Sequence, residues 1–455
     1  MTLGVPTSYR WRIVAVLFFA TTVNYIDRNV LSFCMLDDFF RKEMLGLPAG
    51  AVLSEADANH FKELMGYVDA AFKLAYALGF LIAGYLIDKL GTRKGFSISI
   101  AMWSIAAVLN GFVGSIKGLS VTRFLLGLGE SGNFPSAVKS VAEWFPRKER
   151  SFAAGLFNAG ANIGVITTAL AVPLITLHYG WRASFVTTGL LGFVVLICWR
   201  WVYSKPEEQK NLSAEELAHI RSDNEEDLSE KISWAQLLRH KQTWAFVVGK
   251  FLADPIWYFY LTWLPDFFNS SESLEQKLDL KNIGLPFIII YLVSDAGSIF
   301  FGWLSSRLIQ NGWEVNKARK LTMLICAVCV APIVLASTTH NIYIAVALIA
   351  LAAAAHQGWS ANMYTLASDM FPKKSVASVV GIGSMFGAIG GVLFAASTGV
   401  VRVKFGYVPL FVIAGGAYLT ALLIIHLIVP KLEPVKKISE GRGGESKQTR
   451  CGNSL

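Results

Sequence analysis

The sequence contains little charge for its length. Asp, Glu, Lys and Arg make up 16% of the 455 residues, whereas an average soluble domain has about 25%. Hydrophobic residues reach 54%, and the mean hydropathy is +0.47. This composition excludes a disordered or collagen-like chain and argues against a soluble enzyme. Because a membrane-spanning helix needs about 20 apolar residues, the chain can supply about twelve spans, and we predict an all-α membrane protein.

Cysteine is scarce as well, and the five cysteines form no disulfide framework. They are Cys34, Cys198, Cys326, Cys329 and Cys451. The C-x-x-C formed by Cys326 and Cys329 lies in an apolar run without a second pair or a nearby histidine, which favours helix packing over a metal site. The chain also lacks a nucleophile–base arrangement, a metal cluster and a phosphate-binding loop. We therefore expect that it is not an enzyme and binds no metal.

Basic residues outnumber acidic ones, giving a formal net charge of +9, but they form no nucleic-acid patch. They lie in short loops between twelve apolar runs. The loops on one side hold Arg10, Arg12, Lys89, Arg93, Lys94, Arg147, Lys148, Arg150, Lys317, Arg319, Lys320, Lys373 and Lys374. An excess of Lys and Arg marks cytoplasmic loops. We therefore expect a multi-pass protein of the cell inner membrane, in contact with the lipid bilayer, with both termini cytoplasmic.

A polar, charge-rich segment divides the chain. We expect an N-terminal six-helix half over 1–203, a cytoplasmic linker loop over 204–242, a C-terminal six-helix half over 243–430 and a disordered tail over 431–455. Within the linker, Ser213 stands three residues before Glu216, a spacing that fits a capping box and predicts a short surface helix.

The two halves repeat a pattern of glycines and aromatic residues. Gly132, Phe145, Pro146, Gly155, Gly164 and Gly180 recur at a spacing of 226 as Gly358, Phe371, Pro372, Gly381, Gly390 and Gly406. Because an offset of six spans leaves the orientation unchanged, the halves are parallel repeats about an axis normal to the membrane. This duplication is typical of alternating-access carriers with a cavity between the halves.

The loop that begins at Gly84 resembles the signature loop of the major facilitator superfamily, G-x-L-x-D-[RK]-x-G-x-[RK]-[RK], at every fixed position. We predict a gating role for Gly84, Asp88 and Arg93, because glycine permits close helix packing and the charges can bridge helix ends. The alternative is that the basic residues only set topology. The copy in the second half starts at Gly302 and has Ser306 in place of the aspartate.

Ionisable side chains inside predicted spans are costly to bury and are candidates for function. Asp27 and Arg28 lie within the first span, and Arg123 and Glu130 lie two turns apart on one face of the fourth. The cations can hold an anion, and the carboxylates Asp27 and Glu130 can take up a proton. The alternative is a structural salt-bridge network. Lys139, near the end of the fourth span, is interpreted as a snorkelling side chain.

Polar and aromatic residues in later spans indicate a sugar site. His356 begins the stretch His-Gln-Gly-Trp-Ser-Ala-Asn, which contains Trp359 and Asn362 and suits hydroxyl recognition beside a stacking aromatic. Trp257 and Asn162 are further candidates. The alternatives are an interfacial aromatic belt for Trp257 and helix–helix bonding for Asn162.

Two further pairs of charges inside spans stand at i,i+4, Asp69 with Lys73 and Lys250 with Asp254. This spacing favours satisfied ion pairs. Asp295 stands alone in the eighth span, where bonding to a neighbouring helix and a functional role are equally open.

Beyond the superfamily loop, the chain resembles the anion:cation symporter family and, within it, the hexuronate transporters. The shared stretches are 24–29, 74–79, 123–132, 142–150, 157–164, 251–265 and 356–362. The resemblance implies inward symport of a sugar acid with protons. It also implies that Arg28 holds the carboxylate, with Tyr25, Tyr76 and Trp359 around the sugar.

For the coupling ion, the resemblance implies that Asp27 and Glu130 are the protonation sites and that Arg123 is a partner of Glu130. Lys73 is a departure from the family, because a neutral polar residue is expected there.

We therefore expect a twelve-span major facilitator carrier, monomeric, that imports a hexuronate such as glucuronate or galacturonate by alternating access. The proton is its coupling ion, and no cofactor is expected. The expected substrate-binding residues are Tyr25, Arg28, Tyr76, Arg123, Asn162, Trp257, His356, Trp359 and Asn362. The alternatives are a symporter of another organic anion such as galactonate or glucarate, a proton antiporter or exporter, and a transporter-like sensor.

Overall fold

The computed structural model describes residues 9–223, 232–270, 274–275 and 284–435. Within these ranges the chain forms sixteen α-helices, two 3₁₀ helices and no strand. The expected disordered tail lies outside the described residues from position 436 onward.

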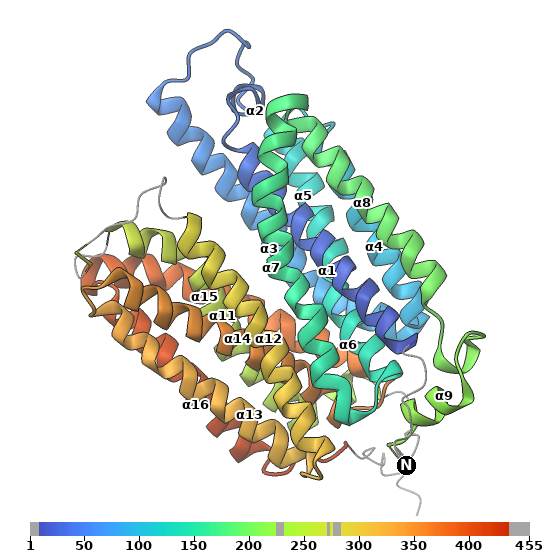
Figure 1. The fold of residues 1–455 in the computed structure, drawn as a ribbon. Coiled ribbons are helices and arrows are strands. Elements are labelled where there is room, and N and C mark those ends of the chain that lie inside the picture. The colour runs from blue at the N-terminus through green and yellow to red at the C-terminus, as the bar shows by residue number, and fades with distance from the viewer. Residues whose placement is uncertain (1–8, 224–231, 271–273, 276–283, 436–455) are drawn as a thin grey trace, which may run out of the picture.

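The helices form two groups that lie side by side (Figure 1). The first group is α1 (Tyr9–Cys34), α2 (Asp38–Met44), α3 (Glu55–Leu90), α4 (Thr92–Asn110), α5 (Ile116–Glu130), α6 (Asn133–Trp144), α7 (Arg147–Tyr179) and α8 (Trp181–Val202). The short elements η1 (Pro206–Glu208), α9 (Ala214–Ile220) and α10 (Trp234–Leu237) follow. The second group is α11 (Lys241–Ser270), α12 (Gly284–Gln310), α13 (Val315–Val330), η2 (Ala331–Ser337), α14 (Ile342–Met370), α15 (Val376–Phe405) and α16 (Val408–Ile428). We call these two groups the N-half and the C-half.

The long helices correspond to the twelve predicted spans when α5 and α6 are counted as one span and α13 and η2 as another. Among the described residues, eight helices are long and apolar enough to cross a membrane by length and composition. The others are short or charged: α1 and α11 each carry four charged residues, and the fourth span is divided into α5 and α6 at residues 131–132. The all-helical, twelve-span architecture is confirmed.

The predicted repeat is visible in the backbone. Gly180 and Gly406, which are 226 residues apart, follow α7 and α15 and both have positive φ, +81° and +71°. Glycine adopts this conformation without the steric cost of a Cβ atom, so it allows the chain to turn into the next helix. The repeat is not complete, because Gly132 separates α5 from α6 while Gly358 lies inside the continuous helix α14.

The linker helix is confirmed, but its predicted capping box is wrong. The Ser213 hydroxyl accepts a hydrogen bond from the Glu216 N–H at 3.1 Å, as a helix N-cap does. The Glu216 carboxylate does not bond back to Ser213. It accepts the backbone N–H groups of Tyr9 and Arg10, both at 3.1 Å, because the first N–H groups of α1 have no partner within their own helix. The linker thereby caps the first span.

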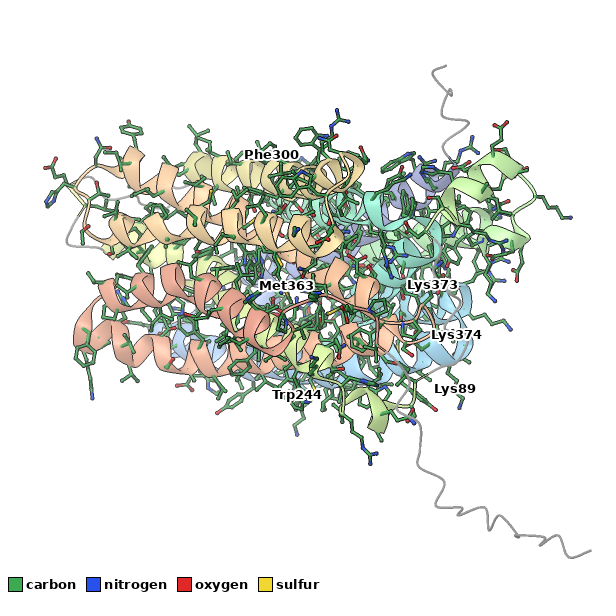
Figure 2. The ribbon with its side chains drawn as sticks, turned by 90° about the horizontal axis from the view of Figure 1, so that it is seen from below. Lys89, Trp244, Phe300, Met363, Lys373 and Lys374 are labelled. Carbon is green, nitrogen blue, oxygen red and sulfur yellow. The ribbon has the colours of Figure 1, made fainter. Side chains whose placement is uncertain are left out.

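We call the end of the bundle where α1 begins and α16 ends the terminal face, and the other end the distal face. Lys89 at the end of α3 and Lys373 and Lys374 between α14 and α15 lie toward the same end of the molecule in Figure 2. Trp244 and Phe300, on the outside of the C-half, are 42% and 51% exposed, as suits a surface in contact with lipid.

The halves touch near the terminal face mainly through two helix pairs, α3 with α15 and α7 with α12, and α7 with α14 and α6 with α15 extend these contacts. Glycine permits each close approach. A Cβ at Gly84 of α3 would lie 2.5 Å from the Ala377 carbonyl oxygen of α15. A Cβ at Gly302 of α12 would collide with the Ser151 carbonyl of α7 in the same way. These contacts close the terminal face.

Candidate functional site

A cavity of about 660 Å³ lies between the two halves. Its mouth is at the distal face, where the exposed residues Lys62, Gly66 and Asp69 of α3 line it. Seven of the nine predicted binding residues line its walls: Tyr25, Arg28, Tyr76, Arg123, Asn162, Trp257 and His356. The cavity is thus open on one side and closed by the helix contacts on the other.

Arg28 is the central cation of the N-half wall. Its Nε donates to the Glu130 carboxylate at 2.8 Å, and its guanidinium lies 4.7 Å from the ring centroid of Tyr25 and 4.4 Å from that of Tyr76. The Arg28 side chain is 18% exposed, whereas the Glu130 side chain is fully buried. The guanidinium therefore faces the cavity in front of a carboxylate that the solvent does not reach.

Arg123 does not form the expected ion pair with Glu130. Its guanidinium donates to the backbone carbonyl of Arg28 at 3.0 Å and of Asp27 at 3.5 Å, and it lies over the Phe72 ring at 4.9 Å. Arg123 therefore holds the backbone of α1 at the position of Arg28, while its positive charge remains in the cavity wall.

Asp27 is buried behind this wall and does not line the cavity. Among the described residues, neither of its carboxylate oxygens has a hydrogen-bond partner, and Thr188 of α8 is a polar neighbour. An ionised carboxylate is costly in such a place, and protonation removes that cost. The site therefore contains two buried carboxylates: Glu130, which is paired with the accessible Arg28, and Asp27, which has no hydrogen-bond partner among the described residues.

The C-half wall is aromatic and polar. Trp257 of α11 stacks on His356 of α14 with ring centroids 4.9 Å apart and planes at 4°. His356 Nδ1 is hydrogen-bonded to the Tyr418 hydroxyl at 2.5 Å. Both rings of this stack line the cavity.

Two asparagines of α7 connect the halves across the cavity. Asn158 donates to Gln357 at 2.6 Å, and Asn162 donates to Asp295 at 2.7 Å. The predicted lining residue Asn162 thus uses its amide in bonding between helices. The same bond gives Asp295 a partner, so this aspartate bonds to a neighbouring helix.

Trp359 and Asn362 do not line the cavity, contrary to the prediction. Trp359 is buried with its ring edge-on to Tyr418, 5.4 Å between centroids. Asn362 is hydrogen-bonded within α14 and to Ser151 of α7. On a helix, residues three or four apart share a face, and the face of α14 that reaches the cavity carries His356, Gln357, Ser360 and Tyr364 instead.

Two residues assigned minor roles from the sequence belong to the site. Lys250 and Asp254 form the predicted i,i+4 ion pair at 2.9 Å, and both line the cavity. The sequence feature that indicates a functional role for these two residues is their charge inside a predicted span. Asp69 and Lys73 also pair, at 2.7 Å, but near the mouth, where both side chains are half exposed.

The predicted gating residues divide into two sets. Gly84 and Asp88 lie in the α3–α15 contact, where the Asp88 carboxylate accepts the Ser378 N–H at 2.7 Å. Arg93 donates to the Arg200 carbonyl, so its hydrogen bond lies within the N-half. Lys139 is not snorkelling: it is buried, 3% exposed, and paired with Asp88 at 2.7 Å.

Two parallel helical halves, closed at one face around a cavity lined by charged and aromatic side chains, define a membrane carrier rather than a channel or an enzyme. The chain belongs to the Major Facilitator Superfamily, whose sequence model matches residues 17–395 and 318–452. The predicted superfamily and the prediction of a transporter that is not an enzyme are confirmed.

Curated relatives cover nearly the whole chain. The chain is 30% identical over 438 residues to the hexuronate transporter of Escherichia coli (strain K12), covering 95% of this chain and 96% of that one. It is also 30% identical over 409 residues to the probable galactarate/D-glucarate transporter GarP of the same organism, covering 86% and 87%. Among solved structures, the proton:xylose symporter XylE matches with a TM-score of 0.68 at 15% identity, covering 94% of this chain and 97% of that chain, a likeness of fold.

Proposed function

We propose that this chain imports a sugar acid together with protons by alternating access, with the hexuronates glucuronate and galacturonate as the first substrates to test. The observation that carries the proposal is the arrangement of Arg28, which is accessible from the cavity, lies between two tyrosines and is paired with the buried Glu130. One relative is named a hexuronate transporter and another a probable galactarate/D-glucarate transporter. These names support the substrate class.

In this proposal the substrate carboxylate binds Arg28 in place of Glu130. Glu130 then loses its salt bridge inside a buried site, where an unpaired carboxylate is costly, so it takes up a proton. Asp27, buried without a hydrogen-bond partner among the described residues, is the second proposed protonation site. The anion and the proton therefore stabilise each other, which is the basis of symport.

The proposed orientation places the terminal face in the cytoplasm, because basic residues of both halves gather there, including Lys89, Lys373 and Lys374. The distal mouth of the cavity then faces outward, and the structure represents the substrate-accepting state. Closure around a bound sugar acid would separate the α3–α15 and α7–α12 contacts at the cytoplasmic face.

The first test is uptake of labelled glucuronate into proteoliposomes, with and without an inward proton gradient. Unlabelled galacturonate, galactonate, glucarate and neutral glucose serve as competitors. Uptake that the gradient stimulates and that sugar acids but not glucose inhibit supports the proposal. Uptake that is indifferent to the gradient would overturn proton symport, and no uptake of any sugar acid by folded protein would overturn the substrate class.

Glu130→Gln separates binding from coupling. We expect the variant to exchange external for internal substrate but to lose accumulation driven by a proton gradient, because glutamine keeps a polar contact to Arg28 and cannot titrate. Glu63→Gln, at the exposed start of α3, is the matched control and should accumulate substrate normally. Gradient-driven accumulation by Glu130→Gln at the wild-type level would remove Glu130 from coupling.

A further inference from the structure

The cavity contains a second cation–carboxylate pair, on the wall opposite Arg28. The ammonium group of Lys250 lies 2.9 Å from the Asp254 carboxylate and 3.3 Å from the Tyr364 hydroxyl, and it lies over the Tyr364 ring at 4.6 Å. The pair repeats the arrangement of the first site, where Arg28 is bound to Glu130 and packed against tyrosines. Each half of the protein thus presents to the same cavity a cation that is paired with a carboxylate and packed on an aromatic ring.

A glycine of α15 makes room for the carboxylate of this pair. A Cβ at Gly387 would collide with the Asp254 carboxylate. A Cβ at Gly383 would collide with Phe246 and would lie at ordinary van der Waals distance, 3.5 Å, from Cγ of Lys250. The Asp254 carboxylate therefore packs directly against the backbone of α15 at Gly387.

Burial distinguishes this pair from the other lysine–aspartate pair of the cavity. The side chains of Lys73 and Asp69 are 51% and 52% exposed, so water screens their charges. Those of Lys250 and Asp254 are 5% and 21% exposed. Of the described cavity-lining residues of the C-half, Lys250 is the only lysine or arginine.

We propose that Lys250 binds a second carboxylate of the substrate, so that the preferred substrates are sugar acids with a carboxylate at both ends of the carbon chain, the aldarates. This inference rests on the proposed function, because it assumes that Arg28 holds the first carboxylate. A hydroxyl or ring oxygen would give the Lys250 ammonium only a neutral acceptor, whereas a carboxylate gives it an ionised acceptor and forms an ion pair. The incoming carboxylate takes the place of Asp254, which is partly exposed to the cavity and remains solvated when released.

Such a dianion would touch both halves at once, Arg28 in the N-half and Lys250 in the C-half. Both cations line this one cavity, and ring contacts connect the tyrosines over which they lie: Tyr25, beside Arg28, packs on Phe134, which stacks on Tyr364, beside Lys250. A ligand that binds both walls favours the conformation in which the walls approach each other. Lys250 is therefore a specificity-determining residue.

The test is competition against labelled galacturonate uptake by the full-length protein in proteoliposomes. The inhibition constants of galactarate and glucarate are compared with those of galacturonate and galactonate. In the wild type we expect the aldarates to inhibit at concentrations at least about tenfold lower, which is about 1.4 kcal/mol of binding free energy. Lys250→Gln should reduce the ratio of the uronate to the aldarate inhibition constant to about one. Lys250→Arg should restore this ratio toward the wild-type value.

Because Lys250→Gln leaves Asp254 without its cation, the double variant Lys250→Gln/Asp254→Asn provides a neutral pair of nearly unchanged shape. It should also have a ratio of about one. Lys73→Gln is the matched control for removal of a lysine from the same cavity, and it should keep the wild-type ratio. Thermal stabilisation of each detergent-purified variant by galactarate and by galacturonate measures binding without transport.

Equal inhibition by aldarates and uronates in the wild type, or a preference that survives in the double variant, would overturn the inference and leave the proposed function standing. If folded wild-type protein takes up no sugar acid and none stabilises it, the proposed function fails and the inference fails with it.

Discussion

The α3–α15 and α7–α12 contacts are related by the internal repeat, and they differ in their charges. Gly84 and Gly302 allow the same close approach in each. In the first contact the Asp88 carboxylate accepts the Ser378 N–H, and in the second the Ser306 hydroxyl accepts the Phe152 N–H at 3.2 Å. Phe152 and Ser378 are 226 residues apart. The backbone arrangement is therefore duplicated, and the side chain that accepts the hydrogen bond is not.

The charge absent from position 306 appears beside the second contact, where α14 meets α7. Asp369 binds Arg319 of its own half at 3.0 Å and Arg150 of the N-half at 3.3 Å, and all three side chains are buried. Its counterpart in the repeat, Glu143, binds Thr92 and Tyr203 within the N-half. One contact thus relies on a carboxylate aimed at a helix end, and the other on an ion pair between the halves. Duplication preserved the close packing, which tolerates little change, and left the electrostatics free to diverge.

The largest expected effect is at Asp88. Asp88→Asn should abolish most uptake and lower the thermal stability, because it leaves Lys139 buried without its counter-ion, and breaking a buried pair costs about 3–5 kcal/mol. The measurements are initial uptake rates and melting temperatures in detergent. Asp88→Asn/Lys139→Gln removes both charges and should recover part of the loss. Wild-type uptake by Asp88→Asn would show that the α3–α15 contact functions without a charge.

Substitution of the contact glycines is expected to have the next largest effect on uptake. The loss of uptake should be equal for the two contacts. Gly84→Ala and Gly302→Ala each place a Cβ against a carbonyl of the opposite half, and overpacking of this kind costs about 1–3 kcal/mol. Each should reduce uptake by about tenfold or more, since about 1.4 kcal/mol corresponds to tenfold. Gly416→Ala, where a Cβ meets no atom within 4 Å, is the control. A loss at only one of the two glycines would contradict the symmetry of the contacts.

The smallest expected effect is at Ser306. Ser306→Ala removes one hydrogen bond to the Phe152 N–H, worth about 0.5–1.5 kcal/mol, and leaves the Asp369 ion pairs in place. Uptake should fall by less than about tenfold, well below the effect at Asp88. The measurement compares the initial uptake rates of Ser306→Ala and Asp88→Asn in parallel, at equal protein content. An equal or greater loss at Ser306 would place the controlling interaction in the second contact.

Local spacing predicted much of the site. The pairs Asp69–Lys73 and Lys250–Asp254 form as expected, because i,i+4 residues of one helix are neighbours whatever surrounds them. Arg28 and Glu130 lie on different helices. The sequence indicates a functional role for both, because a charged side chain inside a span is costly and usually functional. Their direct ion pair at 2.8 Å, however, depends on how the tertiary structure places α1 relative to α5.

The predictions that were wrong concern which face of a helix is directed toward the cavity or toward another helix. Trp359 and Asn362 belong to a polar stretch of α14 that continues around the helix, so composition could not show which face reaches the cavity. Lys139 stands near a helix end, where a snorkelling side chain and a buried ion pair have the same local sequence. Only the position of Asp88 on another helix distinguishes them.

By itself, the sequence determined the membrane location, the twelve helices, the duplicated halves and the superfamily, because these follow from apolar run length, loop charge and repeated motifs along the chain. Tertiary packing places Lys250 but not Trp359 in the cavity wall, lets Glu216 cap the first span, and puts the Asp369 ion pair of α7 and α14 beside the second contact. The reason is physical. Local spacing sets which residues share a helix face, whereas burial, ion pairing and access to the cavity depend on which face of another helix lies opposite.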